Sequence, residues 1–307
     1  MTAGRVMVLG ASGFIGSHVS AAFLARGFEV VGIGHGKRPE RDLASLGPFR
    51  WIEGEITFEG LRALGDLGPF TCAVNCSGSG TVSYAYAQPW LDFHRSVGTT
   101  AALLEWARLQ KQPTPRVLLL SSAAVYGDIG PRDACEDDAC SPISPYGWHK
   151  VAAEQLCETY SKHFEVPATV IRLFSVYGEG LRKQLLWDAL DKFSRGQFQF
   201  FGTGNESRDW VHVEDAAELV ALAGLVPGTT FDVFNGGGVQ ASVRQVLKQL
   251  ARAYGVEAQL RFSGEIHPGS PIRLTSCHAK ASRQLGWEAQ IPLQSGLRRY
   301  ANWFKSL

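Results

Sequence analysis

The sequence predicts an α/β protein built on a doubly wound parallel sheet, with a smaller C-terminal domain interleaved with it. Three observations predict this fold. Short apolar, β-branched runs alternate with helical patterns through the first two-thirds of the chain, a glycine-rich segment follows the first run, and the alternation breaks after about Gly178. Strands that alternate with helices form a parallel sheet that helices cover on both faces. Such strands are almost continuously apolar because both of their sides are buried, as at residues 117–120.

The elements of the sheet are expected in a regular order. Strands are predicted at residues 5–9, 29–33, 50–53, 72–75, 116–120 and 168–173. The first helix, at residues 14–26, is closed by Gly27, since glycine readily adopts the left-handed backbone of a helix C-terminus. Two longer helical patterns, at residues 89–110 and 145–163, separate the later strands.

Beyond residue 178 the predicted elements are less regular. They comprise a helix at 181–195, a glycine-rich loop at 202–207, a strand at 209–213, a helix at 214–225 and a strand at about 231–234. Three helical patterns close the chain, at residues 242–254, 278–285 and 293–304.

The composition excludes several classes of protein. Among 307 residues, 30 Lys and Arg against 29 Asp and Glu give a net charge of +1, which argues against binding nucleic acid. The hydrophobic share of 45% argues against disorder. The six cysteines form no Cys-x-x-Cys pair, so no metal site is expected. No signal pattern begins the chain and no apolar run approaches ~20 residues, so we expect no membrane partner and a cytoplasmic protein.

A glycine-rich loop, Gly10-Ala-Ser-Gly13-Phe-Ile-Gly16, follows the first strand and opens the first helix. In this position Gly10 permits a tight turn, Gly13 lets the backbone approach a pyrophosphate, and Gly16 allows helix and strand to pack closely. The positive end of the helix then attracts the phosphates. We therefore predict a Rossmann-like dinucleotide-binding domain. Its expected loop contacts are Gly10, Ser12, Gly13, Phe14, Ile15 and Gly16.

The end of the second strand bears on which dinucleotide binds. NAD sites usually place Asp or Glu there, hydrogen-bonded to the ribose 2′-hydroxyl. Here residues 32–38 contain no carboxylate, and the first one after them is Glu40. His35, Lys37 and Arg38 are suited to pair with a 2′-phosphate. NADP(H) is therefore favoured as the cofactor, with NAD(H) as the alternative.

Tyr146 and Lys150 have i, i+4 spacing at the start of a predicted helix, so both side chains are expected on one helix face. A phenol with a pKa of about 10 is a poor acid or base at neutral pH, and an adjacent ammonium is expected to lower that pKa. Ser122 follows a parallel strand, at the sheet edge where ligands of such folds bind. There its hydroxyl is suited to hold a carbonyl oxygen while Tyr146 transfers the proton.

With these motifs the chain resembles the extended short-chain dehydrogenases/reductases, the family of nucleotide-sugar epimerases, dehydratases and reductases, over nearly its whole length. The resemblance implies that Ser122, Tyr146 and Lys150 form the catalytic triad, with Lys150 also holding the nicotinamide ribose. The motifs that carry it are the three glycines, Ser121-Ser-Ala-Ala-Val-Tyr-Gly127, Ser144-Pro-Tyr-Gly-Trp-His-Lys150, Arg172-Leu-Phe-Ser-Val-Tyr-Gly178 and Arg208-Asp-Trp-Val-His-Val213.

The resemblance also implies a set of binding residues. Glu55 and Ile56 resemble the pair that contacts adenine, and residues 178–184 with Arg208 resemble the segments that bind the nucleotide diphosphate. A planar guanidinium suits a diphosphate. The expected substrate contacts are Ser122, Tyr146, Ser175, Arg182, Gln184, Arg208 and Arg273.

The departures from the family pattern concern the substrate. Family dehydratases carry an Asp-Glu pair directly after the catalytic hydroxyl residue, where this chain has Ala123 and Ala124, so dehydration is not expected. His267-Pro-Gly-Ser270 replaces the Arg-Pro-Gly-Asp of some epimerases, and Arg273 either takes over that phosphate contact or is a surface residue. Serine replaces the asparagine of many relatives at two positions, Ser96 and Ser175.

Domains and reaction follow as expectations. Residues 1–177 and about 209–235 are expected to form the dinucleotide-binding domain, and about 178–208 with 236–307 the nucleotide-sugar domain. The favoured reaction is NADPH-dependent reduction of a nucleotide-4-keto-6-deoxyhexose at C4. A nucleotide-sugar 4-epimerase with a recycled cofactor is the alternative, and a non-catalytic cofactor-binding regulator is the third reading. Family members commonly form homodimers through a four-helix bundle, for which residues 89–110 and 145–163 are expected.

Overall fold

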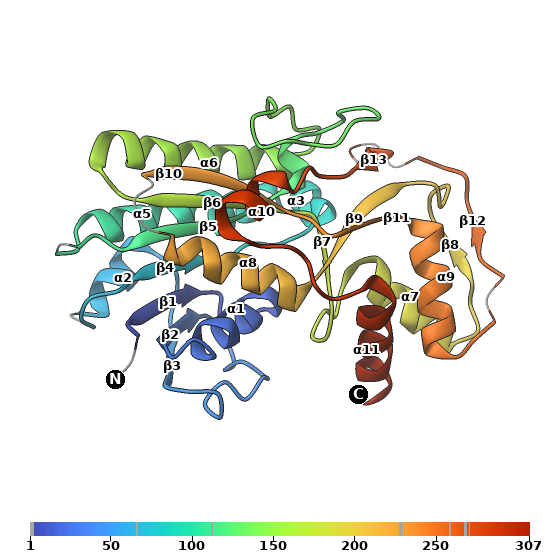
Figure 1. Ribbon diagram of the computed structural model, residues 1–307, viewed down its shortest axis with the longest axis horizontal. Helices are drawn as coiled ribbons and strands as arrows, with labels where there is room; N and C mark the ends of the chain where they lie inside the picture. Colours follow the sequence, from blue (N-terminus) through green and yellow to red (C-terminus); the bar gives the residue numbers. More distant parts are fainter. Residues whose placement is uncertain are drawn as a thin grey trace.

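The computed structural model describes residues 3–65, 67–111, 113–226, 230–257, 259–266, 269 and 271–307 (Figure 1). The expectation for His267, Pro268 and Ser270 therefore lies outside the described residues. A seven-stranded parallel sheet has the order β10-β6-β5-β4-β1-β2-β3, which confirms the predicted α/β fold. Its strands are β1 (Arg5–Leu9), β2 (Glu29–Gly34), β3 (Phe49–Glu53), β4 (Cys72–Asn75), β5 (Arg116–Ser122), β6 (Ala168–Leu173) and β10 (Phe231–Gly236).

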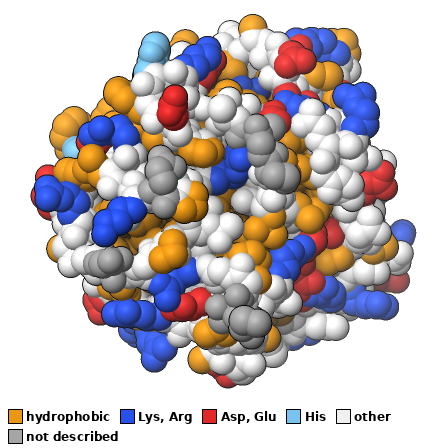
Figure 2. Space-filling model, turned by 60° about the vertical axis from the view of Figure 1, so that its left-hand side comes forward, with side chains coloured by type: hydrophobic (Ala, Val, Ile, Leu, Met, Phe, Trp, Pro, Cys, Tyr) orange, Lys and Arg blue, Asp and Glu red, His pale blue; other side chains and the backbone are white. Residues whose placement is uncertain are grey.

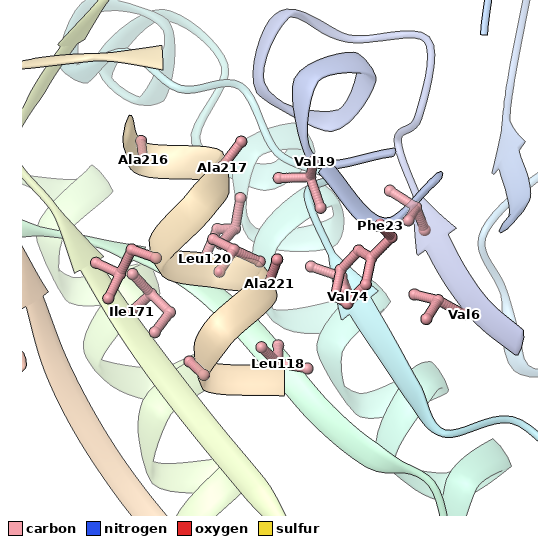
Figure 3. Close-up of a cluster of buried hydrophobic side chains, with 14 of the residues drawn as sticks. Val6, Val19, Phe23, Val74, Leu118, Leu120, Ile171, Ala216, Ala217 and Ala221 are labelled. Atoms are coloured by element: carbon pink, nitrogen blue, oxygen red, sulfur yellow. The ribbon is translucent and has the colours of Figure 1, made fainter. Parts of the chain in front are cut away.

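Helices cover both faces of this sheet. One face packs against α1 (Phe14–Leu24), α8 (Val213–Leu225) and α10 (Ala279–Leu285), and the other against α2 (Phe58–Ala63), α5 (Thr99–Arg108) and α6 (Pro145–Phe164). The alanines of α8 let this helix lie close to the larger side chains of the strands. Figure 3 shows this contact and that of α1. Ala216, Ala217 and Ala221 lie against Leu118, Leu120 and Ile171, and Val19 and Phe23 lie beside Val74 and Val6.

A smaller unit contains the remaining strands, with a hydrophobic core of its own. Its helices are α7 (Gln184–Ser194), α9 (Val243–Tyr254) and α11 (Leu293–Lys305), near the C-terminus in Figure 1. The domain boundaries expected from the sequence stay a prediction. One sheet joins β7 (Ser175–Tyr177), β9 (Ser207–His212), β11 (Val239–Ser242) and β13 (Arg273–Leu274), and a second pairs β8 (Gln199–Phe200) with β12 (Arg261–Phe262).

The single helix expected at residues 89–110 is interrupted. The chain forms α3 (Val82–Ala87) and α4 (Pro89–Phe93), then a π-helical turn (His94–Gly98), and only then α5. The apolar spacing of the sequence does not reveal this turn, because its widened hydrogen bonds add one residue without ending the helix. π-helical turns are rare in proteins, but those that occur often lie at functional sites.

The surface shows charges of both signs. In Figure 2, Lys and Arg side chains alternate with Asp and Glu over the face that is turned to the viewer. Within the described part of the chain, no helix has both the length and the apolar content of a membrane-spanning segment. The same part holds no group of three or more His, Cys, Asp or Glu side chains that could bind a metal ion.

The carboxyl ends of the central strands meet along one edge of the large sheet. Leu9 at the end of β1 is in register with Ile33 of β2 and Asn75 of β4. Ser122 at the end of β5 is in register with Leu173 of β6. The loops that follow these strands therefore converge, at the edge where open α/β sheets bind their ligands.

Candidate active site

A cavity of about 960 Å³ lies along this edge, between the large sheet and the smaller unit. All three residues predicted from the sequence to act in catalysis, Ser122, Tyr146 and Lys150, line it. Its walls come from the glycine loop (13–16), the loop after β4 (76–78 and 80–83), the end of β5 (120–124), the start of α6 (Ser144, Tyr146, Lys150), the segment after β6 (173–177) and the smaller unit (including 183–186, Phe201, Gly202, Glu206 and Arg208).

The glycine loop has the geometry of a dinucleotide cradle. Gly10 adopts a φ of +75°, and its carbonyl accepts a hydrogen bond from the Gly13 N–H at 2.9 Å, which closes the tight turn out of β1. A Cβ on Gly16 would lie 2.1 Å from the Gly10 carbonyl oxygen, so no side chain fits there. The first turn of α1 faces the cavity, and its N-terminal end favours negative charge. These features fit the pyrophosphate of the predicted cofactor.

The residues expected at the adenosine end lie outside the cavity walls. His35, Lys37 and Arg38 are exposed beyond β2, Glu55 is exposed, and Ile56 is half-buried against the core under α2 and α5. The end of β2 is bounded instead by the ring of Trp51, which comes within 3.0 Å of a Cβ built on Gly34. No described contact tests the roles expected of these five residues.

Tyr146 and Lys150 come together in the first turns of α6. The helix starts because the Ser144 hydroxyl accepts a hydrogen bond from the Gly147 N–H at 3.2 Å and Pro145 occupies the first turn. Tyr146 is 8% exposed and Lys150 is 4% exposed, and both line the cavity. The Lys150 ammonium donates to the Leu120 carbonyl at 2.9 Å and lies 5.8 Å from the centre of the Tyr146 ring.

Burial dominates the ionisation of this pair. It raises the pKa of Tyr146 to about 12; a hydrogen bond with Ser122 opposes the rise, and the charge of Asp92 adds to it. Burial also lowers the pKa of Lys150, while Asp92, Glu154 and Cys76 raise it. The sequence led us to expect that Lys150 would lower the pKa of Tyr146, and this is not seen. The reason is geometric, since the ammonium lies over the ring and is hydrogen-bonded to a backbone carbonyl.

Three of the other residues expected to contact the substrate line the cavity. Ser175 opens β7, and Gln184 donates its side-chain amide to the Gly80 carbonyl at 2.9 Å. Arg208 donates to the Ser207 and Ile272 carbonyls at 2.8 and 3.3 Å, and burial lowers its pKa. All three side chains thus face the space between the sheet and the smaller unit.

Two expected contacts lie elsewhere. Arg182 forms an ion pair with Glu40 at 3.0 Å and lies over the ring of Trp303, outside the cavity lining. Arg273 pairs with Asp133 at 2.7 Å, which ties β13 to the loop before α6. In both cases a carboxylate remote in the sequence binds the guanidinium, so the structure does not place these arginines on a substrate phosphate.

The structure places in the cavity wall one basic residue, Lys183, that was not among the substrate contacts expected from the sequence. Lys183 lines the cavity and donates to the Ser79 carbonyl at 2.8 Å, and burial lowers the pKa of its ammonium. Its position beside Gln184, within the segment 178–184 that resembles diphosphate-binding segments, was the available signal. A lysine at this place suits an anionic substrate group.

The residues after Ser122 leave no acid or base beside the catalytic pair. Ala123 is buried, and Ala124 lines the cavity. Among the described residues of the cavity wall the one carboxylate is Glu206, which accepts hydrogen bonds from the backbone N–H and the hydroxyl of Thr203 at 2.7 and 3.0 Å. The described cavity wall thus has no acid–base pair next to Ser122 that could remove water.

Comparison with known proteins identifies similar chains. The family described as "NAD dependent epimerase/dehydratase family" matches residues 6–235. A UDP-glucuronate 4-epimerase of Thermodesulfobacterium geofontis is 25% identical, over 98% of this chain and 96% of that protein. UDP-glucuronic acid 4-epimerase of Bacillus cereus, solved with UDP-glucuronic acid and NAD, is 25% identical with a TM-score of 0.86 over 98% of this chain and 99% of that one. MoeE5, solved with UDP-glucuronic acid and NAD, is 29% identical with a TM-score of 0.88 over 99% and 100% of the two chains.

Proposed function

The chain belongs to the NAD dependent epimerase/dehydratase family, and from this premise we propose that it is a nucleotide-sugar 4-epimerase. We further propose a UDP-hexose as substrate, with UDP-glucuronic acid and UDP-glucose as the first candidates, because similar proteins were solved with these compounds. The observation that carries the proposal is the meeting of Ser122, Tyr146 and Lys150 in one cavity with the glycine cradle.

Each of these side chains has a distinct task in the proposed reaction. Bound NAD supplies the hydride acceptor for C4 of the hexose and the donor for its return. Tyr146 takes the proton of the C4 hydroxyl during oxidation and gives it back to the carbonyl oxygen during reduction. Ser122 donates a hydrogen bond to that oxygen, and Lys150 holds a positive charge beside the phenol. The cavity would have to let the keto sugar turn between the two transfers, so that the opposite face of C4 could be reduced.

The epimerase is favoured over the reductase that the sequence led us to expect. The similar proteins with a stated activity include UDP-glucuronate 4-epimerases, and the Bacillus cereus 4-epimerase and MoeE5 were both solved with NAD. Ala123 and Ala124 make a dehydratase an unsuitable assignment, because neither side chain can act as the acid or base that removes water. A regulator without activity would not need both Tyr146 and Lys150 in the cavity.

The test is to incubate the purified protein with UDP-glucuronic acid and, separately, with UDP-glucose. We expect each active substrate to convert to its 4-epimer, which chromatography and NMR would detect. The same equilibrium should be reached when the reaction starts from the epimer. Absorbance of reduced nicotinamide should show no net change. Stoichiometric loss of NADPH with a nucleotide-4-keto-6-deoxyhexose, and no epimerisation, would overturn the proposal in favour of the reductase.

We propose NAD as the cofactor of this reaction, while the preference for NADP(H) expected from the basic segment stays a prediction. Lys37→Ala and Arg38→Ala test it. If these side chains bind a 2′-phosphate, each variant should lower the affinity for NADP about tenfold, as measured by titration calorimetry, since a charge-assisted hydrogen bond contributes about 1.5–3 kcal/mol. NAD affinity should not change. An unaltered ratio of the two affinities would exclude the role given to the basic segment.

We also propose that the protein forms a homodimer through the α4–α5 and α6 helices. Apolar side chains are exposed there, with Trp90 72% and Trp148 57% exposed, and Phe93 lies beside Trp90. Exposed apolar patches of this kind mark interaction surfaces. Trp148→Asp should convert the dimer to monomer in analytical ultracentrifugation. Val239→Asp, at an exposed apolar position on β11, is the control and should stay dimeric; a wild-type monomer would refute the proposal.

A further inference from the structure

Asp92 is a fully buried carboxylate beside the proposed active site. It lies in α4, just before the π-helical turn, and is 0% exposed. A buried charge is costly unless other groups compensate it, so its partners matter. The Ser79 hydroxyl donates to one carboxylate oxygen, and His149 Nδ1 contacts the other at 2.6 Å. An ionised carboxylate only accepts hydrogen bonds, so His149 carries its proton on Nδ1.

These two partners connect the cavity wall to the catalytic helix. Ser79 lies between Gly78 and Gly80, which line the cavity, and its carbonyl accepts the hydrogen bond from Lys183. His149 directly precedes Lys150 on α6 and follows Tyr146 by one turn. A continuous chain of hydrogen bonds thus runs from Lys183, through Ser79 and Asp92, to α6.

We propose that Asp92 is a positioning residue for the proposed reaction: it fixes the loop after β4 against α6 and places a negative charge behind Tyr146 and Lys150. It acts through Ser79 and His149 and through its charge.

The charge of Asp92 has a definite direction of effect. Its carboxylate raises the pKa of Lys150, ahead of Glu154 and Cys76, against the lowering caused by burial. It also raises the pKa of Tyr146. Asp92 therefore favours an ammonium on Lys150 and a protonated phenol on Tyr146. The titratable and charged groups on the elements around it include Tyr146, His149, Lys150 and Glu154 on α6, Cys76 after β4, Tyr84 and Tyr86 on α3, His94 and Arg95 on the π-helical turn, and Lys183 beyond Ser79.

Asp92→Asn tests the proposal by the pH profile of kcat. The amide keeps the size of the side chain and removes the charge, so the pKa values of Tyr146 and Lys150 should both fall. Both limbs of the profile should move to lower pH, by about 1 unit, the smaller end of the 1–3 units by which a charge within about 4–6 Å shifts a pKa. The shape of the profile does not depend on the fraction of active protein, so partial misfolding does not obscure it.

His149→Ala and Ser79→Ala are the matched variants, because each keeps the carboxylate and removes one donor. Their profiles should stay in place or move to higher pH, with a several-fold lower kcat. His149→Asn, which restores a donor, should recover much of that loss. A fall in kcat for Asp92→Asn without a shift of either limb would reduce Asp92 to a packing role. A downward shift in the two alanine variants would overturn the proposal even if Asp92→Asn fails to fold.

The inference rests on the proposed function only through the need for turnover. A second measurement removes that need: the ionisation of Tyr146 is followed by ultraviolet difference absorbance against Tyr146→Phe, with and without Asp92→Asn. Tyr146 should ionise at lower pH when Asp92 is neutral. If no nucleotide sugar is turned over, the proposed function fails, whereas an unshifted Tyr146 titration refutes the role of Asp92.

Discussion

Tyr146→Phe is expected to lower kcat for 4-epimerisation by about 10²–10⁴-fold, the usual contribution of a general acid–base group. The phenol is the proton carrier of the proposed reaction, and the cavity wall holds no second acid or base next to Ser122 within the described residues. Removing the hydroxyl leaves the glycine cradle and Lys150 in place. NAD affinity, measured by titration calorimetry, should therefore remain within about twofold, well under the tenfold that 1.4 kcal/mol represents.

A matched control separates chemistry from packing. Tyr300 is also a buried tyrosine, but its hydroxyl donates to the Leu181 carbonyl at 2.6 Å inside the smaller unit. Tyr300→Phe should cost about 1 kcal/mol of stability, the net value of one hydrogen bond, with kcat nearly unchanged. If Tyr146→Phe keeps more than a tenth of the wild-type kcat, Tyr146 is not the proton carrier.

Tyr146→Phe should also change how the stability of the protein depends on pH. Folding raises the pKa of Tyr146 from 10.0 to about 12, chiefly through burial. A raised pKa means that the stabilisation is complete below pH 10 and is lost as the pH rises from there toward 12. In cofactor-free protein, the free energy of unfolding should thus fall less steeply in this window for Tyr146→Phe than for the wild type, as urea titrations at several pH values would show.

The sequence was sufficient for the large sheet because most of its strands are apolar runs that helices separate along the chain. Residues 72–75 and 168–173 were predicted with the bounds that the structure has. β7, β8, β12 and β13 were not predicted, since strands of two or three residues have too little alternation to be recognised. The π-helical turn was missed because apolar spacing does not distinguish it from α-helix.

The candidate site divides in the same way. Gly16, Tyr146 and Lys150 were predicted because local geometry alone determines where they lie: a loop between strand and helix, or one helix face. The positions of Arg182 and Arg273 could not be read in this way, because they pair with Glu40 and Asp133, which lie about 140 residues away in the sequence. Long-range competition of this kind, like the contact of Asp92 with α6, exists only in the folded chain.

Arg172→Met is expected to destabilise the fold by about 3–5 kcal/mol, the cost of removing one partner of a buried ion pair. Arg172 on β6 donates to both carboxylate oxygens of Glu154 on α6, at 2.8–3.2 Å, and the two side chains are 7% and 8% exposed. Arg172 also donates to the Tyr126 hydroxyl at 3.0 Å. Urea unfolding of cofactor-free protein measures the loss.

The cause of that loss is the carboxylate left behind, and a second substitution can test this. Without Arg172, the Glu154 carboxylate still accepts a hydrogen bond from the Ser121 hydroxyl but has lost its ion-pair partner. The double variant Arg172→Met with Glu154→Leu removes the uncompensated charge, so it should recover most of the stability. Lys162→Met, which breaks the exposed pair with Glu158, should cost less than about 1 kcal/mol. A double variant no more stable than Arg172→Met would show instead that Arg172 stabilises the junction of β6 and α6 through Tyr126 and its packing.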